Sequence, residues 1–361
     1  MSALRGLAEE LGGQFEAAGG SRPDHYGDAD AEVSAARSSA IVVDRSDRGK
    51  LTFTGEDRAS FLHGMLTNTV QGLVEGSGNH TALTDAKGNT QADLWLYHWG
   101  DRLIAETEPG LHTKVATFLD RYIIGDDVTI SDESEQTAII SLQGPDANKI
   151  ASDLLDAPVD LEMYGNVSAD LAGKPARVCR RSYTGEVGYD LWVAKDQAAQ
   201  VFRSLVEAGA TPAGDRAIEV LRIESGLPKY GVDVNDRVVP LEAGLADTVD
   251  FAKGCFIGQE VLAKMQNLGK PRRYFVGTVV EGVDVPDPET DLESGGKVVG
   301  LIKSGLQSNT LGQTICLTSV RRGFESPGTR LTLPDGRACE VVTLPFVPGK
   351  SLNTNDLNVS A

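Results

Sequence analysis

The chain has 361 residues, and a hydrophobic content of 40% is enough for two or three domains with buried cores. No apolar run approaches the roughly 18 to 20 residues of a membrane-spanning helix, and the first residues lack the features of a signal peptide, so we expect a cytosolic protein. The net charge of −18 disfavours broad binding of nucleic-acid phosphates, and the excess of Asp over Glu and of Arg over Lys indicates a halophile-like acidic surface.

Hydrophobic periodicity divides the first 135 residues into alternating elements. An N-terminal stretch of helical character leads into the first strand. The predicted strands are 41–43, 50–55, 93–99 and 102–105, and the predicted helices are 58–66 and 111–122. The β-α-β-β-α order that begins at residue 50 predicts a ferredoxin-like α+β unit.

A second set of elements begins near residue 136 and ends near residue 272. Its predicted strands are 137–142, 177–181 and 189–193. One predicted helix opens at Gly144-Pro145, and the others cover 197–208, 213–224 and 259–266. After Arg272 the pattern changes to short strands separated by Gly, Pro and Asp turns, which is typical of a small barrel or sandwich. We therefore place a domain boundary near residue 273.

Several kinds of site are absent from the sequence. The four cysteines form no CxxC pair and histidines number only five, so we expect no metal site and, in the cytosol, no disulfide. The phosphate-binding loop GxxxxGK[ST], the zinc motif HExxH and the nucleophile elbow GxSxG are also missing.

Four segments carry a more specific pattern. They read LQGP at 142–145, YTGEVGYD at 183–190, LRIESGLPKYG at 221–231 and KGCFIGQE at 253–260. In this order the first three resemble the T-protein, the aminomethyltransferase of the glycine-cleavage system. The fourth resembles the K-G-C-[FY]-x-G-Q-E signature of the YgfZ-like folate-binding branch, which includes a mitochondrial protein that assists iron–sulfur assembly.

The resemblance implies an α+β fold with three domains arranged as a cloverleaf around a central pocket for tetrahydrofolate or a folate derivative. It implies ferredoxin-like α/β units and a small C-terminal β-barrel. The implied folate-binding α/β domain is discontinuous and comprises residues 1–44 and 136–272. The ferredoxin-like α+β domain covers residues 45–135, and the barrel covers residues 273–361.

The resemblance also implies a set of folate-binding residues: Asp93, Tyr97, Asp190 and Arg222. Asp93 matches the second acid of the family's G-G-x-x-D-D-L motif, near N10 of the folate, where a carboxylate can stabilise a developing cation or relay a proton. Considered alone, Asp93 is more often an acid at the start of a strand or in a turn. Tyr97 lies on the same strand face, and ordinary packing is its alternative.

Asp190 and Arg222 match family positions that face the pterin ring. Asp190 replaces the usual Glu, so its reach is one methylene shorter, and a carboxylate there can accept paired hydrogen bonds. The Arg222 fork suits the pterin carbonyl or a neighbouring carboxylate, and a salt bridge with Glu219 or Glu224 is the alternative. Two departures from the T-protein pattern, Ala92 for the first acid and His80 for a folate-side Tyr, put aminomethyl transfer in question.

The motif of the YgfZ-like branch comprises Lys253, Gly254, Cys255, Gly258, Gln259 and Glu260. A helix predicted from Gln259, together with Lys253, favours the thiolate form of Cys255, which gives a reactive or metal-touching sulfur. The alternative is a small buried side chain at the junction of a turn and a helix. Cys179, Cys316 and Cys339 are predicted to be packing residues.

Two functions follow from the resemblance, and a third is simpler. The main hypothesis is a tetrahydrofolate-binding YgfZ-like protein that supports iron–sulfur cluster assembly or repair through Cys255, with iron–sulfur proteins or assembly factors as partners. The alternative is a tetrahydrofolate-dependent aminomethyltransferase or related demethylase that uses Asp93 and a lipoyl carrier protein. A folate carrier or sensor without chemistry is the third.

Overall fold

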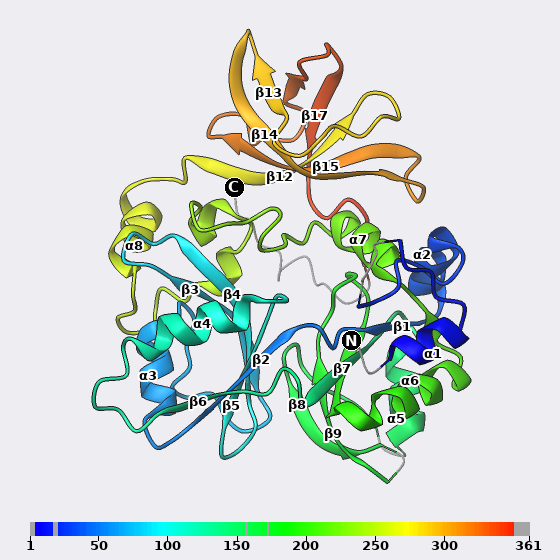
Figure 1. Cartoon of the computed structure of the whole chain (residues 1–361). Helices are drawn as coiled ribbons and strands as arrows, with labels where there is room; N and C mark the ends of the chain where they lie inside the picture. Colours follow the sequence, from blue (N-terminus) through cyan, green and yellow to red (C-terminus); the bar gives the residue numbers. More distant parts are fainter. Residues whose placement is uncertain (1–3, 17–20, 156–157, 172, 350–361) are drawn as a thin grey trace.

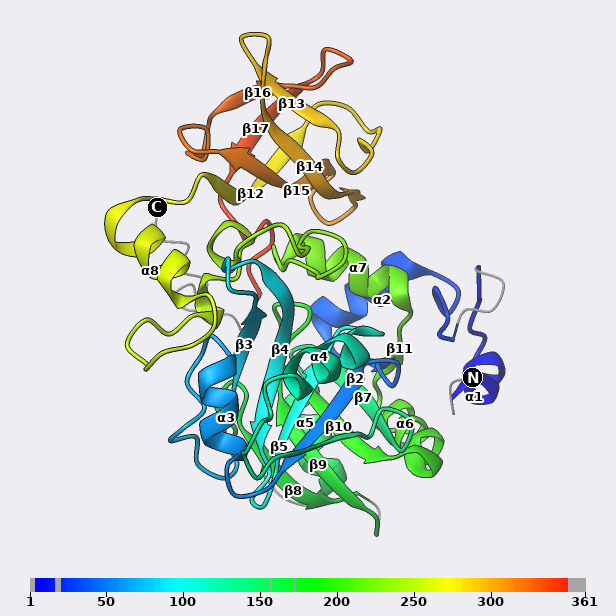
Figure 2. The ribbon, with the colours of Figure 1, turned by 60° about the vertical axis from the view of Figure 1, so that its left-hand side comes forward.

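The computed structural model describes residues 4–16, 21–155, 158–171 and 173–349, which form three lobes (Figure 1). Two of the lobes are built on β-sheets, and the third is a closed barrel that lies above both sheets (Figures 1 and 2). No helix in these ranges is long and apolar enough to cross a membrane. The predicted first and last domains include residues 1–3 and 350–361, which lie outside the described ranges.

The first lobe contains a six-stranded mixed sheet. Its strands, in spatial order, are β11 (Thr211–Pro212), β1 (Ile41–Asp44), β7 (Thr137–Gln143), β10 (Gly188–Ala194), β9 (Pro175–Arg180) and β8 (Asn166–Asp170). Only the β1–β11 pair is parallel. The helices of this lobe are α1 (Arg5–Glu10), α2 (Ala29–Ser38), α5 (Ala147–Leu155), the 3-10 turn η1 (Lys195–Gln197), α6 (Ala198–Glu207) and α7 (Asp215–Glu224).

The central strand β7 shows why this sheet has a core on each face. Ile140 and Leu142 point toward the apolar cluster that includes α5 and α6. Ile139, one residue out of phase, belongs to a separate cluster that faces the second sheet. Because successive side chains of a strand alternate between faces, a strand covered on both sides is buried throughout, as β7 is after its first residue.

The second lobe contains a five-stranded antiparallel sheet with two helices over one face. In spatial order the strands are β3 (Gly78–Thr84), β4 (Thr90–His98), β5 (Leu103–Thr107), β2 (Gly49–Thr54) and β6 (Thr129–Asp132), and the helices are α3 (Arg58–Met65) and α4 (Leu111–Asp120). Leu94 and Leu103 pack under the helices, whereas Tyr97 and Ile104 face the first sheet beside Trp192. The two sheets therefore pack against each other.

The third lobe is a closed six-stranded barrel. Its strand order is β12 (Arg273–Val280), β15 (Gln313–Arg321), β14 (Lys297–Ser308), β13 (Asp291–Ser294), β16 (Arg330–Thr332) and β17 (Ala338–Val342). Cys316 and Cys339 are buried in its apolar core, and Cys179 is buried between the sheets, as predicted for packing residues.

The segment between α7 and the barrel contains η2 (Pro240–Glu242), η3 (Ala246–Thr248) and α8 (Gln259–Leu268). It lies against the second sheet, because Thr67 Oγ1 donates to Thr248 O over 2.6 Å and Thr90 N donates to Val238 O over 2.8 Å. This arrangement brings parts of all three lobes together above the β3–β4 hairpin.

The α+β class and the C-terminal barrel are confirmed, and each strand and helix predicted from periodicity is present with shifted ends. In the first two lobes the sequence pattern missed four strands, β3, β6, β8 and the two-residue β11. The second sheet is consequently larger than the predicted β-α-β-β-α unit. The placement of the domain boundaries at 44, 135 and 272 stays a prediction.

Candidate functional site

A cavity of about 580 Å³ lies where the three lobes meet. Its lining includes His80, Asp93 and Trp95 from the β3–β4 hairpin, Tyr183 from the loop before β10, Arg222 from α7 and Phe275 from β12. Pockets of this size, with aromatic walls and a few polar groups, are typical of sites for small molecules and cofactors. The cavity is therefore the candidate site.

Asp93 is the buried acid of this cavity. It lies on β4, where alternation places Asp93 and Trp95 on the face opposite the helices. Its residue is 3% exposed, Oδ2 lies 3.3 Å from Nε2 of His80, and the buried Oδ1 has no hydrogen-bond partner within the described part of the chain. Since an unpaired buried carboxylate oxygen is costly, Oδ1 is a ready acceptor for a ligand.

His80 connects Asp93 to a second acid. Its Nδ1 lies 3.2 Å from Oδ2 of Asp247 on η3, and its ring stacks on Trp95 with 4.6 Å between ring centroids. Burial acts to lower the pKa of His80, but the carboxylate of Asp247 and then that of Asp93 outweigh burial and raise the pKa to about 9. The two carboxylates therefore favour the cationic form of the histidine.

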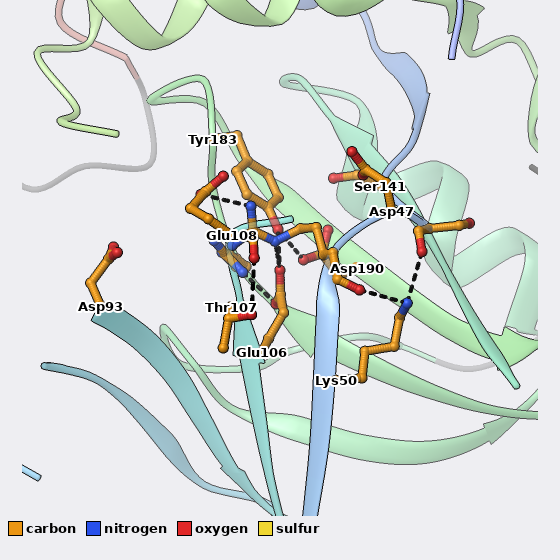
Figure 3. A network of polar contacts seen from close by, with 12 residues as sticks. Asp47, Lys50, Asp93, Glu106, Thr107, Glu108, Ser141, Tyr183 and Asp190 are labelled. Carbon is orange, nitrogen blue, oxygen red and sulfur yellow. Dashed lines mark hydrogen bonds and ion pairs between the residues drawn. The ribbon is translucent and has the colours of Figure 1, made fainter. Parts of the chain in front are cut away.

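A buried group of charges, here called the ionic cluster, lies between the two sheets, and its members Glu108, Arg181 and Tyr183 also line the cavity. Its members are Arg48, Glu106, Glu108, Arg181, Tyr183 and Asp190. Glu106 accepts hydrogen bonds from Arg48 and Arg181, and Tyr183 Oη lies 3.1 Å from it. Figure 3 shows Asp93 on its own strand, apart from this cluster.

The ionic cluster stacks two aromatic rings of the cavity wall against cations. The Arg181 guanidinium carbon lies 3.4 Å from the centre of Trp95 and 4.1 Å from that of Tyr183. Burial acts to raise the pKa of Glu106, but the guanidiniums of Arg181 and Arg48 outweigh it and hold the pKa below its ordinary value. A fully paired, hydrogen-bonded carboxylate of this kind fixes the wall in one arrangement.

Asp190 belongs to the ionic cluster and does not line the cavity. Its Oδ2 accepts from Tyr183 Oη over 2.9 Å, and its carboxylate is fully buried (Figure 3). Burial, with the charge of Glu106, raises the pKa of Asp190 to about 6. Tyr183 therefore separates the predicted pterin acid from the cavity.

Arg222 lines the cavity, but its donors are already used. All five of its N–H groups donate within the protein, to Glu219, Asp233, Leu227 O and Ser304. The structure thus pairs the Arg222 guanidinium with neighbouring carboxylates, which is one of its two expected arrangements; the other was a contact with the pterin carbonyl. In this arrangement the guanidinium shapes the wall and has no N–H left for a ligand.

Tyr97 is fully buried in the cluster between the sheets, at an edge-to-face angle of 75° to Trp192. Its hydroxyl is buried without a hydrogen-bond partner in the described chain. Burial raises the pKa of Tyr97 well above its ordinary value. Of the four predicted folate-binding residues, the structure places Asp93 and Arg222 on the cavity wall and Tyr97 and Asp190 behind it.

Cys255 lies outside the cavity and is exposed. It belongs to a turn at residues 253–258, here called the cysteine turn, which precedes α8; Gln259 and Glu260 begin that helix, three or more residues after the sulfur. Gly258 adopts φ +85°, and a Cβ there would lie 2.6 Å from Asp85 O, so only glycine fits this contact.

Lys253 holds the cysteine turn to the segment after α3. Its ammonium donates to the backbone oxygens of His63, Leu66 and Asn68, the last over 3.0 Å. Burial lowers the pKa of Lys253 to about 8. The ammonium that was predicted to stabilise a thiolate is thus engaged by three carbonyls, and a Cβ at Gly254 would make only an ordinary contact with His63.

The sequence did not identify several groups that shape the site. Glu106, Arg181 and Tyr183 were missed, although a charged residue at the end of an apolar strand such as Leu103–Thr107 is a usable signal of a buried ion pair. His80 was noticed only as a departure from a family pattern. Its partner Asp247 carried no signal, because the two residues are 167 positions apart.

Comparison with known proteins gives matches along nearly the whole chain. The family of the GCVT N-terminal domain matches residues 4–253, and that of the glycine cleavage T-protein C-terminal barrel domain matches residues 273–348. The chain is 33% identical to the aminomethyltransferase of Streptomyces avermitilis over 359 residues, 96% of each protein. It is 31% identical to that of Bacillus subtilis, with 90% of this chain and 91% of the relative covered.

The same architecture occurs in a solved structure. The glycine cleavage system aminomethyltransferase T from Bartonella henselae superposes with a TM-score of 0.88, and the match covers 97% of this chain and 99% of the other. The two sequences are 22% identical, so this likeness concerns the fold.

Proposed function

The chain belongs to the family of the glycine-cleavage T-protein, and on that premise we propose that it binds tetrahydrofolate in the central cavity and transfers a one-carbon unit on it, as an aminomethyltransferase or a related demethylase. This proposal puts the enzymatic alternative ahead of the YgfZ-like hypothesis. Its partner in the aminomethyl reaction is a lipoyl carrier protein.

One observation carries the proposal: a buried carboxylate that presents an unpartnered oxygen at a cavity of cofactor size. Asp93 Oδ2 is held by His80, so Oδ1 is the group available to a ligand. The walls supply the aromatic surfaces of Trp95, Tyr183 and Phe275 against which a flat ring system packs. These residues fit a folate.

Tetrahydrofolate supplies nitrogen atoms that carry the one-carbon unit. Asp93 Oδ1 accepts a hydrogen bond or a proton beside that unit, and its negative charge stabilises positive charge that develops there. Trp95 and Tyr183, against which the Arg181 guanidinium stacks, orient the ring and exclude water. Asp190 takes part indirectly, because it accepts a hydrogen bond from the hydroxyl of Tyr183.

The test combines binding and turnover. Calorimetry measures tetrahydrofolate affinity, and transfer is measured with tetrahydrofolate and a lipoyl carrier protein loaded with the aminomethyl group, as release of ammonia. Asp93→Asn keeps the shape and removes the charge, so transfer is expected to fall by about 100-fold or more. The matched control is Asp101→Asn, an exposed acid in the β4–β5 turn, with wild-type activity expected. Equal activity of wild type and Asp93→Asn would refute the role of Asp93.

A second candidate function rests on the cysteine turn. The K-G-C-F-I-G-Q-E motif presents the Cys255 thiol to solvent, which suits contact with an iron–sulfur protein or assembly factor. In a host lacking this gene, Cys255→Ser should then fail to restore cluster enzymes that the wild-type gene restores. Full restoration by Cys255→Ser rejects this candidate, and absence of product in the transfer assay rejects the first.

A further inference from the structure

His80 is the one histidine in the cavity wall, and both of its ring nitrogens face carboxylate oxygens. The two acids come from different elements, Asp93 from β4 and Asp247 from η3. The amide of Asn68 donates to His80 O over 2.8 Å and to Asp247 O over 3.4 Å. β3 and η3 are thereby fixed relative to each other, and the spacing of the three side chains is set by the backbone.

The geometry determines the charge of the ring. An ionised carboxylate only accepts hydrogen bonds, and a neutral imidazole has a single N–H, so it can serve only one of the two acids. Both contacts are satisfied together when His80 is an imidazolium, and the group Asp247–His80–Asp93 then carries a net charge of one negative unit. The ring lies flat on Trp95, with an interplanar angle of 5°, and cannot turn away without losing this stacking.

Exposure is graded along the three residues. The Asp247 side chain is 45% exposed, that of His80 is 11% exposed and that of Asp93 is 4% exposed. All three residues line the cavity, so solvent and ligand both reach the group there, and Asp247 is its most exposed member. The other facing groups are the Tyr164 ring at 6.4 Å and, across the ring of Trp95, the Arg181 guanidinium.

We propose that His80 is a positioning residue whose imidazolium form holds Oδ2 of Asp93 and leaves Oδ1 directed at the ligand, while Asp247 couples its protonation to the solvent. This inference rests on the proposed function for the identity of the ligand, tetrahydrofolate. When His80 loses its proton, one of its ring nitrogens becomes a hydrogen-bond acceptor. That nitrogen then faces a carboxylate oxygen, which is also an acceptor, and the hydrogen bond is lost. Asp93 is then free to rotate, and ligand affinity falls.

The charge of His80 can be tested without any ligand. Long-range proton–nitrogen NMR of the five histidine rings, from about pH 6 to about pH 10, follows each ring, and His80→Gln identifies the His80 signals. His80 is expected to remain an imidazolium through neutral pH and to titrate near 9. Asp247→Asn should lower that midpoint, whereas Asp236→Asn, an exposed acid of the same segment, should not. Titration of His80 near its ordinary value would overturn the inference.

The consequence for binding is measured by calorimetry with tetrahydrofolate over the same pH range. Wild type is expected to lose about tenfold or more in affinity as pH rises through His80's midpoint. His80→Gln, which keeps an N–H donor without the charge, should bind weakly at neutral pH and show no such step. Asp247→Asn, an exposed change that preserves the core, should move the step to lower pH.

The outcomes separate the two proposals. Identical affinity of His80→Gln and wild type at every pH overturns the positioning role while tetrahydrofolate binding stands. Failure of the wild type to bind tetrahydrofolate at any pH removes the proposed function, and with it the role of His80 toward this ligand. The NMR titration still decides in that case whether the imidazolium is present.

Discussion

The β3–β4 hairpin supports two regions of different physical character. Midway along it, His80 and Asp93 form part of a cavity wall made of buried charges. At its tip, the backbone around Asp85 and Gly88 packs against Gly258 of the cysteine turn. Both regions carry residues that the sequence marks for function, yet only the first has buried ionisable side chains with an unpartnered oxygen.

The contrast shows how differently a motif and a site are built. In the cysteine turn, the recognisable residues serve the backbone: Lys253 binds three carbonyls and Gly258 allows a close approach. At the cavity wall, the decisive contacts join side chains that are distant in sequence. A motif therefore marks where the backbone must take one conformation. The ligand chemistry depends on which side-chain atoms have no partner in that conformation.

Lys253→Met should have the largest effect on stability. The substitution keeps most of the volume but leaves the backbone oxygens of His63, Leu66 and Asn68 without the ammonium that now binds them. Charged hydrogen bonds contribute about 1.5 to 3 kcal/mol each and are not additive, so we expect a loss of about 3 to 4 kcal/mol. Urea unfolding measures it. A change below about 1 kcal/mol would mean that water replaces the ammonium without cost.

His80→Gln should come next, with an effect that depends on pH. The folded-state pKa of about 9 lies above the ordinary value of 6.5, so the stabilisation from protonated His80 is fully present below pH 6.5 and is lost as pH rises through about 9. We expect the variant to be less stable by about 2 to 3 kcal/mol at low pH, with the difference shrinking between about pH 6.5 and about pH 9. Urea unfolding of both proteins across this range gives the curve. A difference independent of pH would indicate lost packing on Trp95 instead.

Much of the fold could be predicted because its cause is local. Short, largely apolar runs identify β7 and β10, and the change to short strands after Arg272 identifies the barrel. β3 escaped because its first residues, Gly-Asn-His, are polar and it is an edge strand with one neighbour in the sheet. Because β3 was not predicted, the strand that places His80 beside Asp93 was not predicted either.

The candidate site was less predictable because its polar contacts are long-range. Asp93 was found through a family pattern, but the pairing of His80 with Asp247 and of Arg181 with Glu106 depends on how the lobes meet. Burial also could not be deduced for Asp190, which the structure places behind Tyr183. A sequence pattern gives the residue type at such a position, whereas its depth is a property of the assembled sheets.

Two glycines of the cysteine turn allow a matched test of the backbone. Gly258→Ala forces a Cβ to 2.6 Å from Asp85 O at φ +85°, whereas a Cβ at Gly254 meets only His63 Nε2 at 3.8 Å. We expect Gly258→Ala to cost about 2 kcal/mol and Gly254→Ala less than about 0.5 kcal/mol, measured by thermal and urea unfolding. Equal costs for the two variants would mean that the hairpin tip moves aside and does not hold the turn.

Cys255→Ser should have the smallest effect of all on the isolated protein. The side chain is exposed and makes no hydrogen bond within the described residues, so stability should change by less than about 0.5 kcal/mol. Tetrahydrofolate affinity should also be unchanged, because the cavity lining does not include this residue. A loss of affinity would show that the thiol affects binding in the cavity. The cavity wall and the cysteine turn would then not be independent of each other. If only the cluster enzymes of the host respond to this variant, the thiol acts on a partner protein, since the chain's own binding and folding do not depend on it.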